Sequence, residues 1–313
     1  MTVATSNVDC PLCGTPTSHT VLNGRPDYEY GVKRALTYRQ CSNGGCGLIF
    51  VKPLPTLAEV STFYQKYSTH TTNDSVPRIP LLSSAGESSG RRALAALFGG
   101  ARLGTLSVLD YGCGGGAFMS KLTSLGVGQV TGYDFDPEAC QNARTRGLNV
   151  LSSEDEVSRS GPYDFIFLNH VIEHLIDPIG DIQRISAYLK VGGKLVLRTP
   201  NTQSTLCRLF GANWRGWETP RHLHLFSMKS LIGLVEAADT AGLRAAYVST
   251  SNAMFLGMYH ESFHTRCWRA GRLGKLVRHA LSYPVFLLST VNKWFTRYSG
   301  EELCLVVEKV ATK

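Results

Sequence analysis

Residues 108–116 read VLDYGCGGG, a short apolar run that ends in an acid and then in a glycine-rich loop. We expect a strand at 107–112 and a helix at 116–125. Glycines allow a ligand to approach the backbone closely, and a helix N-terminus favours negative charge. This stretch therefore predicts a strand–loop–helix unit with a ligand at the loop.

Helix-like and strand-like segments alternate outward from this loop. Asp136-Pro137 and Asp177-Pro178 each combine an N-cap residue with a proline at the first helical position. We expect further strands at 129–135, 163–169, 194–200, 243–251 and 302–310, and helices at 91–103, 137–147, 178–192 and 228–241. This alternation predicts an α/β fold with a mostly parallel, doubly wound, Rossmann-like sheet.

The composition limits the class of protein. The chain has 313 residues, of which 43% are hydrophobic, which is enough for a large core. We see no secretory signal and no apolar run long enough to span a membrane, so we expect a cytoplasmic protein. The nine cysteines are then expected to be metal ligands or buried thiols rather than disulfides.

Four of these cysteines form two knuckles near the N-terminus. Cys10 and Cys13 are spaced C-x2-C, and Cys41 and Cys46 are spaced C-x4-C, with glycines close to both. Such pairs suit a tetrahedral four-thiolate zinc site in a small ribbon, although His19 is an alternative ligand.

The glycine loop has a second interpretation. Gly112, Gly114 and Ala117 match the G-x-G-x-x-A fingerprint of dinucleotide-binding proteins, and Asp134 ends the next expected strand. An acid at that place accepts hydrogen bonds from ribose hydroxyls, so it fits a dinucleotide or any other nucleoside ligand.

Four ordered segments narrow this choice: VLDYGCGGG (108–116), VTGYDFDPEA (130–139), YDFIFLNHVIEHLIDP (163–178) and LKVGGKLVLRTPN (189–201). Together they resemble the class I S-adenosylmethionine-dependent methyltransferases, above all the branch that contains the ubiquinone-biosynthesis O-methyltransferases (methyltransferase 23 type). Asp110 would repel a pyrophosphate but not the cationic methionine end of S-adenosylmethionine.

The resemblance implies roles for particular residues. The backbone of Gly112, Cys113 and Gly114 would hold the amino-acid end of the cofactor. Asp134 would bind the ribose, Phe135 would lie against adenine, and Asn169 would line the pocket. An acid for the adenine amino group is expected near Glu154 or Asp155, where the family pattern fits loosely.

The N-terminal cysteines resemble the zinc-ribbon arm that precedes many bacterial methyltransferases. We therefore expect a zinc ribbon at 1–55, a helix and a linker or lid at 56–90, and a methyltransferase domain at 91–313 with a helical insertion at 253–300.

Residues 170–174 read HVIEH, which matches the H-x-x-E-H pattern of inverted zinc peptidases. That site needs a long helix, and Asp177-Pro178 ends any helix here within a turn. Some relatives in the resembled family instead carry E-x-x-E-H at this place and bind a divalent ion. By that resemblance His170, Glu173 and His174, with His222 or His224, would form a second metal site, which would lower the pKa of an acceptor hydroxyl. A structural turn without metal is the alternative.

Methyl transfer also proceeds without a metal, because it is an in-line displacement that depends mainly on positioning. A neutral hydroxyl acceptor still needs a base whose pKa is near the working pH. His174 and His222 are the candidate catalytic bases.

Residues 253–300 carry most of the basic charge. This segment has seven Lys/Arg and one acid, which gives +6 of the total net charge of +8. It fits a lid or homodimer contact, a peripheral membrane contact, or RNA binding, the last being least favoured.

We therefore expect S-adenosylmethionine-dependent methylation of a small-molecule acceptor, at oxygen rather than carbon or nitrogen, in specialised-metabolite, cell-surface sugar or quinone/lipid biosynthesis. We expect no DNA partner. The alternatives are an RNA methyltransferase and a non-catalytic module that binds the cofactor.

Overall fold

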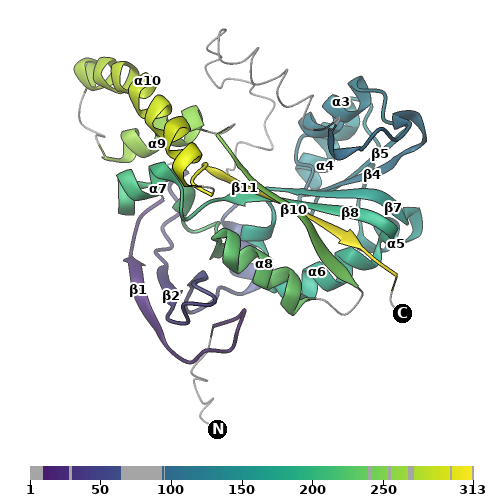
Figure 1. Ribbon diagram of the computed structural model, residues 1–313, viewed down its shortest axis with the longest axis horizontal. Helices are drawn as coiled ribbons and strands as arrows, with labels where there is room; N and C mark the ends of the chain where they lie inside the picture. Colours follow the sequence, from purple (N-terminus) through teal and green to yellow (C-terminus); the bar gives the residue numbers. More distant parts are fainter. Residues whose placement is uncertain are drawn as a thin grey trace. The chain divides into compact units, whose positions relative to one another are not determined.

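The computed structural model describes residues 10–27, 30–64, 94, 96–238, 242–252, 255–266, 271–296 and 298–311 (Figure 1). Among these, the side chains of Phe255, 264–266, 271–276, 278–279 and 293–294 are not described. The expected linker or lid at 71–90 lies outside the described residues, as does most of the helix expected at 91–103.

The chain divides into two compact units. The first contains the described residues of Met1–Lys66, His170–Ala187 and Leu197–Lys313, and the second those of Tyr67–Asn169 and Tyr188–Val196. The domain boundaries predicted above, at residues 55 and 90, come from sequence composition and not from contacts within the fold. They stay a prediction.

A seven-stranded sheet has the order β10-β11-β8-β7-β4-β5-β6. Its strands are β4 (Ser107–Tyr111), β5 (Gln129–Tyr133), β6 (Val150–Leu151), β7 (Tyr163–Asn169), β8 (Leu189–Pro200), β10 (Leu243–Ser251) and β11 (Glu302–Lys309). The pairs of β4 with β5, β4 with β7 and β5 with β6 are parallel, whereas β10 and β11 are antiparallel. The doubly wound α/β fold is therefore confirmed, with a mixed sheet.

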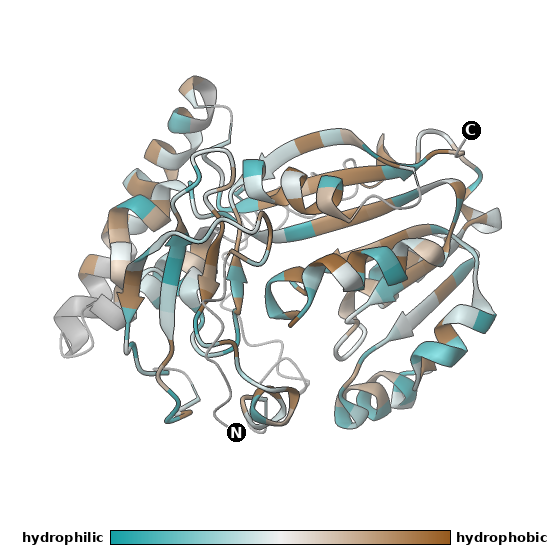
Figure 2. Cartoon of the chain, turned by 90° about the horizontal axis from the view of Figure 1, so that it is seen from below, coloured by the Kyte–Doolittle hydropathy of each residue, from teal (hydrophilic) through white to brown (hydrophobic). Residues whose placement is uncertain are grey.

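The strands at the centre of this sheet are built mainly from buried apolar side chains. All five residues of β4 are buried, and so are Tyr163 and the four residues 165–168 of β7. Strands that are covered on both faces consist of nearly continuous apolar residues, and Figure 2 shows such residues along the strands. The sequence bounds of β7 and β10 match the predicted ones.

The helices that accompany the sheet begin at recognisable caps. They are α3 (Ala117–Ser124), α4 (Pro137–Thr145), α5 (Glu154–Ser160), α6 (Pro178–Ala187), α7 (Thr205–Phe210) and α8 (Met228–Ala237). In α4 the Asp136 side chain accepts from the backbone N–H of Glu138, as the cap-plus-proline motif predicted. The short elements η2 (Leu103–Thr105), η3 (Ile172–His174), η4 (Gly211–Asn213) and η5 (Arg215–Trp217) are 3-10 turns.

The prediction that a helix continues to Gly192 was wrong. Helix α6 ends at Ala187 and β8 begins at Leu189, because the backbone N–H of Tyr163 pairs with the Tyr188 carbonyl at 2.8 Å. Gly192, with φ of 80°, lies inside the strand instead of capping a helix.

A second, four-stranded sheet in the first unit has the order β1-β2-β3-β9. Its strands are β1 (Ser18–Asn23), β2 (Thr37–Cys41), β3 (Ile49–Val51) and β9 (His224–Leu225), and every pair in it is antiparallel. The ribbon strands β1–β3 are thus completed by a strand from far along the chain. Helices α1 (Leu57–Thr62), α9 (Phe255–Arg266) and α10 (Gly271–Phe295) belong to the same unit.

Candidate active site and metal centres

The glycine loop joins β4 to α3 in a conformation that requires glycine. Gly112, Gly114 and Gly116 have φ of 79°, 49° and 78°, in the left-handed region. A Cβ on Gly116 would lie 2.2 Å from Leu148 Cδ1, so the loop also packs too closely for a side chain. This backbone is open to a ligand where the sequence predicted one.

Asp134 holds this loop in place. Its Oδ2 accepts from the backbone N–H of Gly114 at 2.8 Å, and its Oδ1 accepts from the N–H of Asp136 at 3.0 Å. These two contacts hold the carboxylate beside the glycine loop, just after β5. Phe135, the next residue, is 59% exposed, which suits a ring that stacks on a planar ligand.

Asn169 ends β7 and contributes an unsatisfied polar atom. Its Nδ2 donates to Asp110 Oδ1 at 3.4 Å, whereas its buried Oδ1 has no hydrogen-bond partner among the described residues. A buried unsatisfied acceptor is costly unless a ligand donates to it. Burial also raises the pKa of Asp110 to about 7, so this acid lies in a dry setting.

The acid expected near the adenine position already has partners. Tyr111 and Tyr188 both donate to the Glu154 carboxylate, the latter at 2.8 Å. Glu154 and Asp155 occupy the first turn of α5, where acids stabilise a helix N-terminus.

The four ribbon cysteines converge as predicted. The Sγ atoms of Cys10 and Cys46 are 3.7 Å apart, those of Cys13 and Cys41 are 3.6 Å apart, and all four lie within 4.8 Å of one another. A tetrahedral zinc ion with Zn–S bonds of about 2.3 Å requires sulfur separations of about 3.8 Å. The spacing and the thiolate donor set therefore fit zinc.

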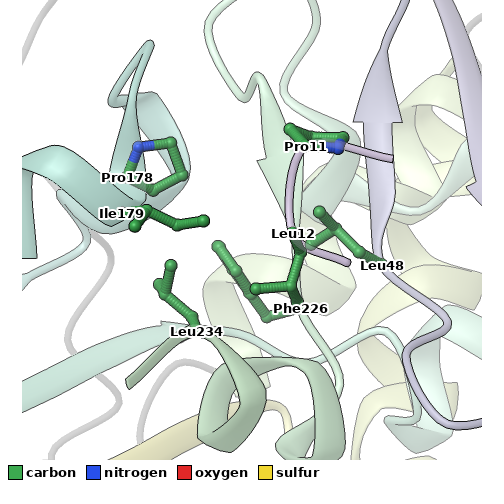
Figure 3. A pocket seen from close by; sticks show the side chains of 7 residues that line it. All are labelled: Pro11, Leu12, Leu48, Pro178, Ile179, Phe226 and Leu234. Atoms are coloured by element: carbon green, nitrogen blue, oxygen red, sulfur yellow. The ribbon is translucent and has the colours of Figure 1, made fainter. Parts of the chain in front are cut away.

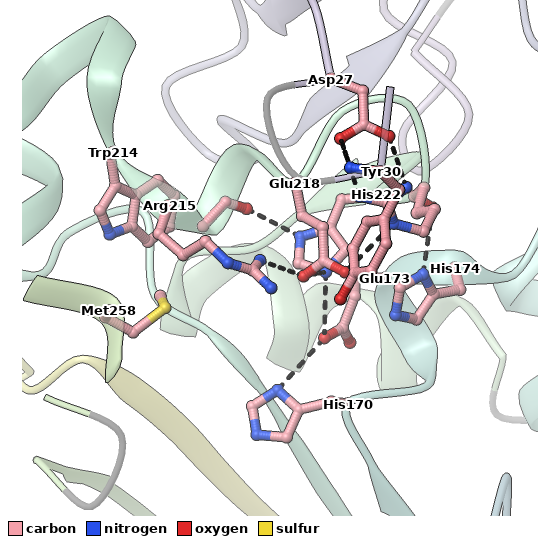
Figure 4. A network of polar contacts seen from close by, with 12 residues as sticks. Asp27, Tyr30, His170, Glu173, His174, Trp214, Arg215, Glu218, His222 and Met258 are labelled. Carbon is pink, nitrogen blue, oxygen red and sulfur yellow. Dashed lines mark hydrogen bonds and ion pairs between the residues drawn. The ribbon is translucent and has the colours of Figure 1, made fainter. Parts of the chain in front are cut away.

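A second group of ligand atoms consists of Glu173, His174 and His222, again within 4.8 Å of one another (Figure 4). Glu173 is fully buried, and neither carboxylate oxygen has a hydrogen-bond partner among the described residues. Its Oε1 lies 3.4 Å from His170 Nδ1 and 3.9 Å from His222 Nε2. Two histidines and one carboxylate are a common ligand set for divalent transition metals.

Backbone carbonyls lie against Nδ1 of both histidines. His174 Nδ1 lies 3.1 Å from the Arg221 carbonyl oxygen, and His222 Nδ1 lies 2.7 Å from the Gly216 carbonyl oxygen. A carbonyl only accepts, so we assign the proton of His222 to Nδ1, whereas at His174 the Tyr64 hydroxyl also lies 2.8 Å from Nδ1 and can donate to it. Metal-binding histidines are held in this way, and so are histidines that act as bases.

The His222 Nε2 faces negative charge. It lies 3.3 Å from Glu218 Oε2 and 3.9 Å from Glu173 Oε1. Burial lowers the pKa of His222 to about 4, so a proton on this nitrogen is disfavoured. A cation bound beside this nitrogen would offset the charge of the two carboxylates.

His170 lies beside this group but is not one of its three members. Its Nε2 contacts Glu302 Oε1 at 3.0 Å while its Nδ1 faces Glu173. Burial alone would lower the pKa of His170, but its contacts with the two carboxylates raise it to about 10. The residue has a φ of 56°. Its role as a metal ligand stays a prediction.

His224 lies outside the Glu173–His174–His222 group. Its Nδ1 faces the Leu175 carbonyl oxygen at 3.1 Å, and its position in β9 pairs it with Phe50 of the ribbon. Of the two downstream histidines that the sequence left open, the structure groups His222 with Glu173.

Sequence reasoning missed the side chains that surround this cluster. The Arg221 guanidinium, 1% exposed, pairs with Asp27 at 2.8 Å and stacks over the Tyr30 ring at 4.5 Å. Tyr38 donates to the His222 carbonyl oxygen at 2.9 Å, and Tyr64 Oη lies 2.8 Å from His174 Nδ1. Asp27, Tyr38 and Tyr64 come from the N-terminal arm, and neither charge nor spacing marked them out.

A small cavity in the same unit is lined only by apolar side chains (Figure 3). It measures about 10 Å³, and its lining residues are Pro11, Leu12, Leu48, Pro178, Ile179, Phe226 and Leu234. A space of this size holds at most one water, so it is a packing gap rather than a ligand site.

The structure thus joins a Rossmann-like sheet, a glycine loop after β4, an acid after β5 and a histidine–carboxylate group after β7. Comparison with known proteins gives the class: a family model described as "Methyltransferase domain" matches residues 71–244. The chain belongs to this family and is an S-adenosylmethionine-dependent methyltransferase, as the sequence predicted.

Individual relatives agree with this assignment. A ubiquinone biosynthesis O-methyltransferase of Xanthomonas oryzae pv. oryzae is 34% identical over 176 residues, which cover 53% of this chain and 71% of the relative. One from Xanthomonas axonopodis pv. citri is 32% identical over 179 residues with the same coverage. A solved methyltransferase from Archaeoglobus fulgidus aligns with 71% of this chain and 92% of its own, at 19% identity and a TM-score of 0.45. The assignment rests on the sequence matches.

Proposed function

We propose that this methyltransferase transfers the methyl group of S-adenosylmethionine to a hydroxyl oxygen of a small molecule. The observation that carries the proposal is the Glu173–His174–His222 group, which brings two imidazoles beside a buried carboxylate. The relatives named above are O-methyltransferases, which favours oxygen over carbon or nitrogen.

The cofactor would be held by the second unit. Backbone groups at Gly112, Cys113 and Gly114 would take the amino-acid end, Asp134 the ribose hydroxyls, and Phe135 the adenine face. Asn169 Oδ1 would gain the donor that it lacks. The chain itself links this site to the histidine group, since His170 directly follows Asn169.

In the transfer, the residues of this chain position the acceptor and accept its proton. An acceptor hydroxyl that approaches His174 or His222 would give its proton to the imidazole. Its oxygen would then bond to the methyl carbon in line as the bond from that carbon to the sulfur breaks, and S-adenosylhomocysteine would leave. Glu173 would stabilise the imidazolium that forms. The Gly216 carbonyl keeps the His222 ring in the tautomer with its proton on Nδ1.

The same group also fits a divalent ion. Glu173, His174 and His222 would hold it, and when bound it would lower the pKa of the acceptor hydroxyl. The charges around it support this. Four carboxylates are counted as negative (Asp27, Glu173, Glu218 and Glu302) and three groups as positive (Arg215, Arg221 and protonated His170). With the other imidazoles neutral, the net charge is −1. The structural zinc of the ribbon would be a separate ion on the four cysteines.

Two alternatives are less well supported. A ribbon that served only to bind RNA or a protein partner would be expected to fold apart from the catalytic cluster. Here β3 pairs with β9, and Tyr38 of the ribbon sheet bonds to the His222 carbonyl. The ribbon therefore supports the candidate site, which favours an enzyme of small molecules.

Turnover of S-adenosylmethionine with matched acceptor panels, one of phenols and catechols and one of amines, tests the proposal. We expect product only with hydroxyl acceptors, and a loss of about 100-fold or more in kcat for His222→Gln or His174→Gln with cofactor affinity unchanged. His19→Gln, an exposed histidine on β1, is the control. Full activity in both cluster variants would contradict the assignment of the base.

Metal content per chain tests the ions. We expect Cys10→Ser/Cys13→Ser to lose one zinc and Glu173→Gln to lose a different ion while it keeps the zinc. A wild-type protein that retains only the cysteine-bound ion after equilibration with divalent metals would exclude the second site and leave the histidines as bases.

A further inference from the structure

Helix α10 has its apolar side chains on the outside. Every described residue of this helix that is exposed is apolar or tyrosine: Val277, Ala280, Leu281, Tyr283, Pro284, Leu287, Leu288 and Phe295. The large ones are between 42% and 84% exposed. A helix on the surface of a soluble protein normally shows water its polar face.

The two described side chains of α10 that are buried are both serines. Ser282 and Ser289 are 1% and 0% exposed, and Ser289 Oγ accepts from Asn252 Nδ2 at 3.2 Å. At about 100° per residue, the exposed positions fall within an arc of about 160°, and the two serines lie on the opposite side. Among the described side chains of α10, the outer arc is therefore an apolar stripe.

Charge indicates what covers this stripe. Residues 262–300 contain seven Lys/Arg and no acid, whereas the remainder of the chain is almost neutral. A second copy of the chain would carry the same positive charge in this segment, which disfavours self-association. An anionic surface that is apolar beneath its charges complements both properties.

We propose that α10 docks on the surface of an anionic phospholipid bilayer, with its apolar stripe among the acyl chains. The helix lies in the plane of the interface: none of the helices within the described residues is long and apolar enough to cross a membrane. This inference is independent of the methyl-transfer chemistry, because α10 contributes no residue to the candidate active site.

Vesicle flotation of the full chain tests the proposal, with phosphatidylglycerol-containing vesicles compared with pure phosphatidylcholine. We expect the wild type to float with the anionic vesicles, and high salt to weaken this. Leu281→Glu/Leu288→Glu should lower the bound fraction about tenfold or more, because two charges enter the apolar stripe. Leu57→Glu, at a leucine of α1 that is 75% exposed, should bind as the wild type does.

Three results would overturn the proposal. The first is no flotation on anionic vesicles at low salt, and the second is equal flotation of the double variant. The third is a wild-type dimer by light scattering that the double variant breaks without any vesicle binding, which would make the stripe a subunit contact. Both mutated leucines are exposed, so an unchanged melting temperature serves as the folding control.

Discussion

The buried ion pair of Asp27 and Arg221 gives the sharpest energetic prediction. Both side chains are at most 2% exposed, and Arg221 Nη1 lies 2.8 Å from Asp27 Oδ2. Asp27→Asn removes the negative charge but keeps the shape, which leaves the guanidinium buried with fewer partners. Breaking such a pair typically costs about 3–5 kcal/mol.

The surroundings of Arg221 reduce that figure. Its Nε still lies 3.3 Å from Glu218 Oε1, and its guanidinium still stacks on Tyr30. A retained carboxylate and a cation–π contact of about 1 kcal/mol bring the expected loss of stability to about 2–3 kcal/mol.

A double-mutant cycle separates the pair from other effects of the mutation. Asp27 also accepts from the backbone N–H groups of Tyr30 and Val32, and those bonds are weakened in every Asp27→Asn background. Urea unfolding of the wild type, Asp27→Asn, Arg221→Met and the double variant should give a coupling energy of about 2 kcal/mol. A coupling energy below about 0.5 kcal/mol would refute the reasoning, because it would mean that water reaches the pair.

Two further predictions concern buried groups elsewhere in the same unit. Tyr38→Phe removes the hydrogen bond to the His222 carbonyl at a fully buried position, so thermal unfolding should show a loss of about 1–2 kcal/mol; no loss would mean that another donor replaces the hydroxyl. Burial raises the pKa of Glu301 to about 7, so its folded state prefers the proton. Its contribution to stability is fully present below the unfolded pKa near 4.5 and is lost as the pH rises through 7, by up to about 3 kcal/mol. Glu301→Gln should therefore gain stability over the wild type between pH 5 and pH 8, and a difference that does not change with pH would contradict this.

Much of the fold could be predicted from short segments of the sequence. Fully apolar strands such as β7 and cap-plus-proline starts such as Asp136-Pro137 are decided within a few residues, so their bounds could be predicted closely. Helix α5 was missed although Ser153 and Glu156 form a Ser-x-x-Glu start, in which the serine accepts from the Glu156 N–H. The Gly192-Gly193 pair led to the opposite error, because it was interpreted as the end of a helix. These residues instead belong to β8, which pairs with β7.

The candidate site also has parts that the sequence predicted and parts that it did not. Cysteine spacing alone predicted the thiolate cluster, and the glycine loop is read directly from VLDYGCGGG. The choice between His222 and His224 could not be made from sequence, because only the fold shows that His222 lies with Glu173 and His174 whereas His224 faces the Leu175 carbonyl. The arm residues Asp27, Tyr38 and Tyr64 could not be found either, because their partners lie more than a hundred residues away.

The pairing of β3 with β9 has a consequence for synthesis of the chain. Ile49 and Phe50 are made early but must wait for Leu225 and His224, which leave the ribosome only after most of the catalytic core. All three residues of β3 are buried in the finished protein, so until then the ribbon carries an apolar, unpaired edge. Such edges pair readily with other chains. Prematurely terminated products would therefore be recognised by chaperones or aggregate, and only the complete chain would seal its own N-terminal edge.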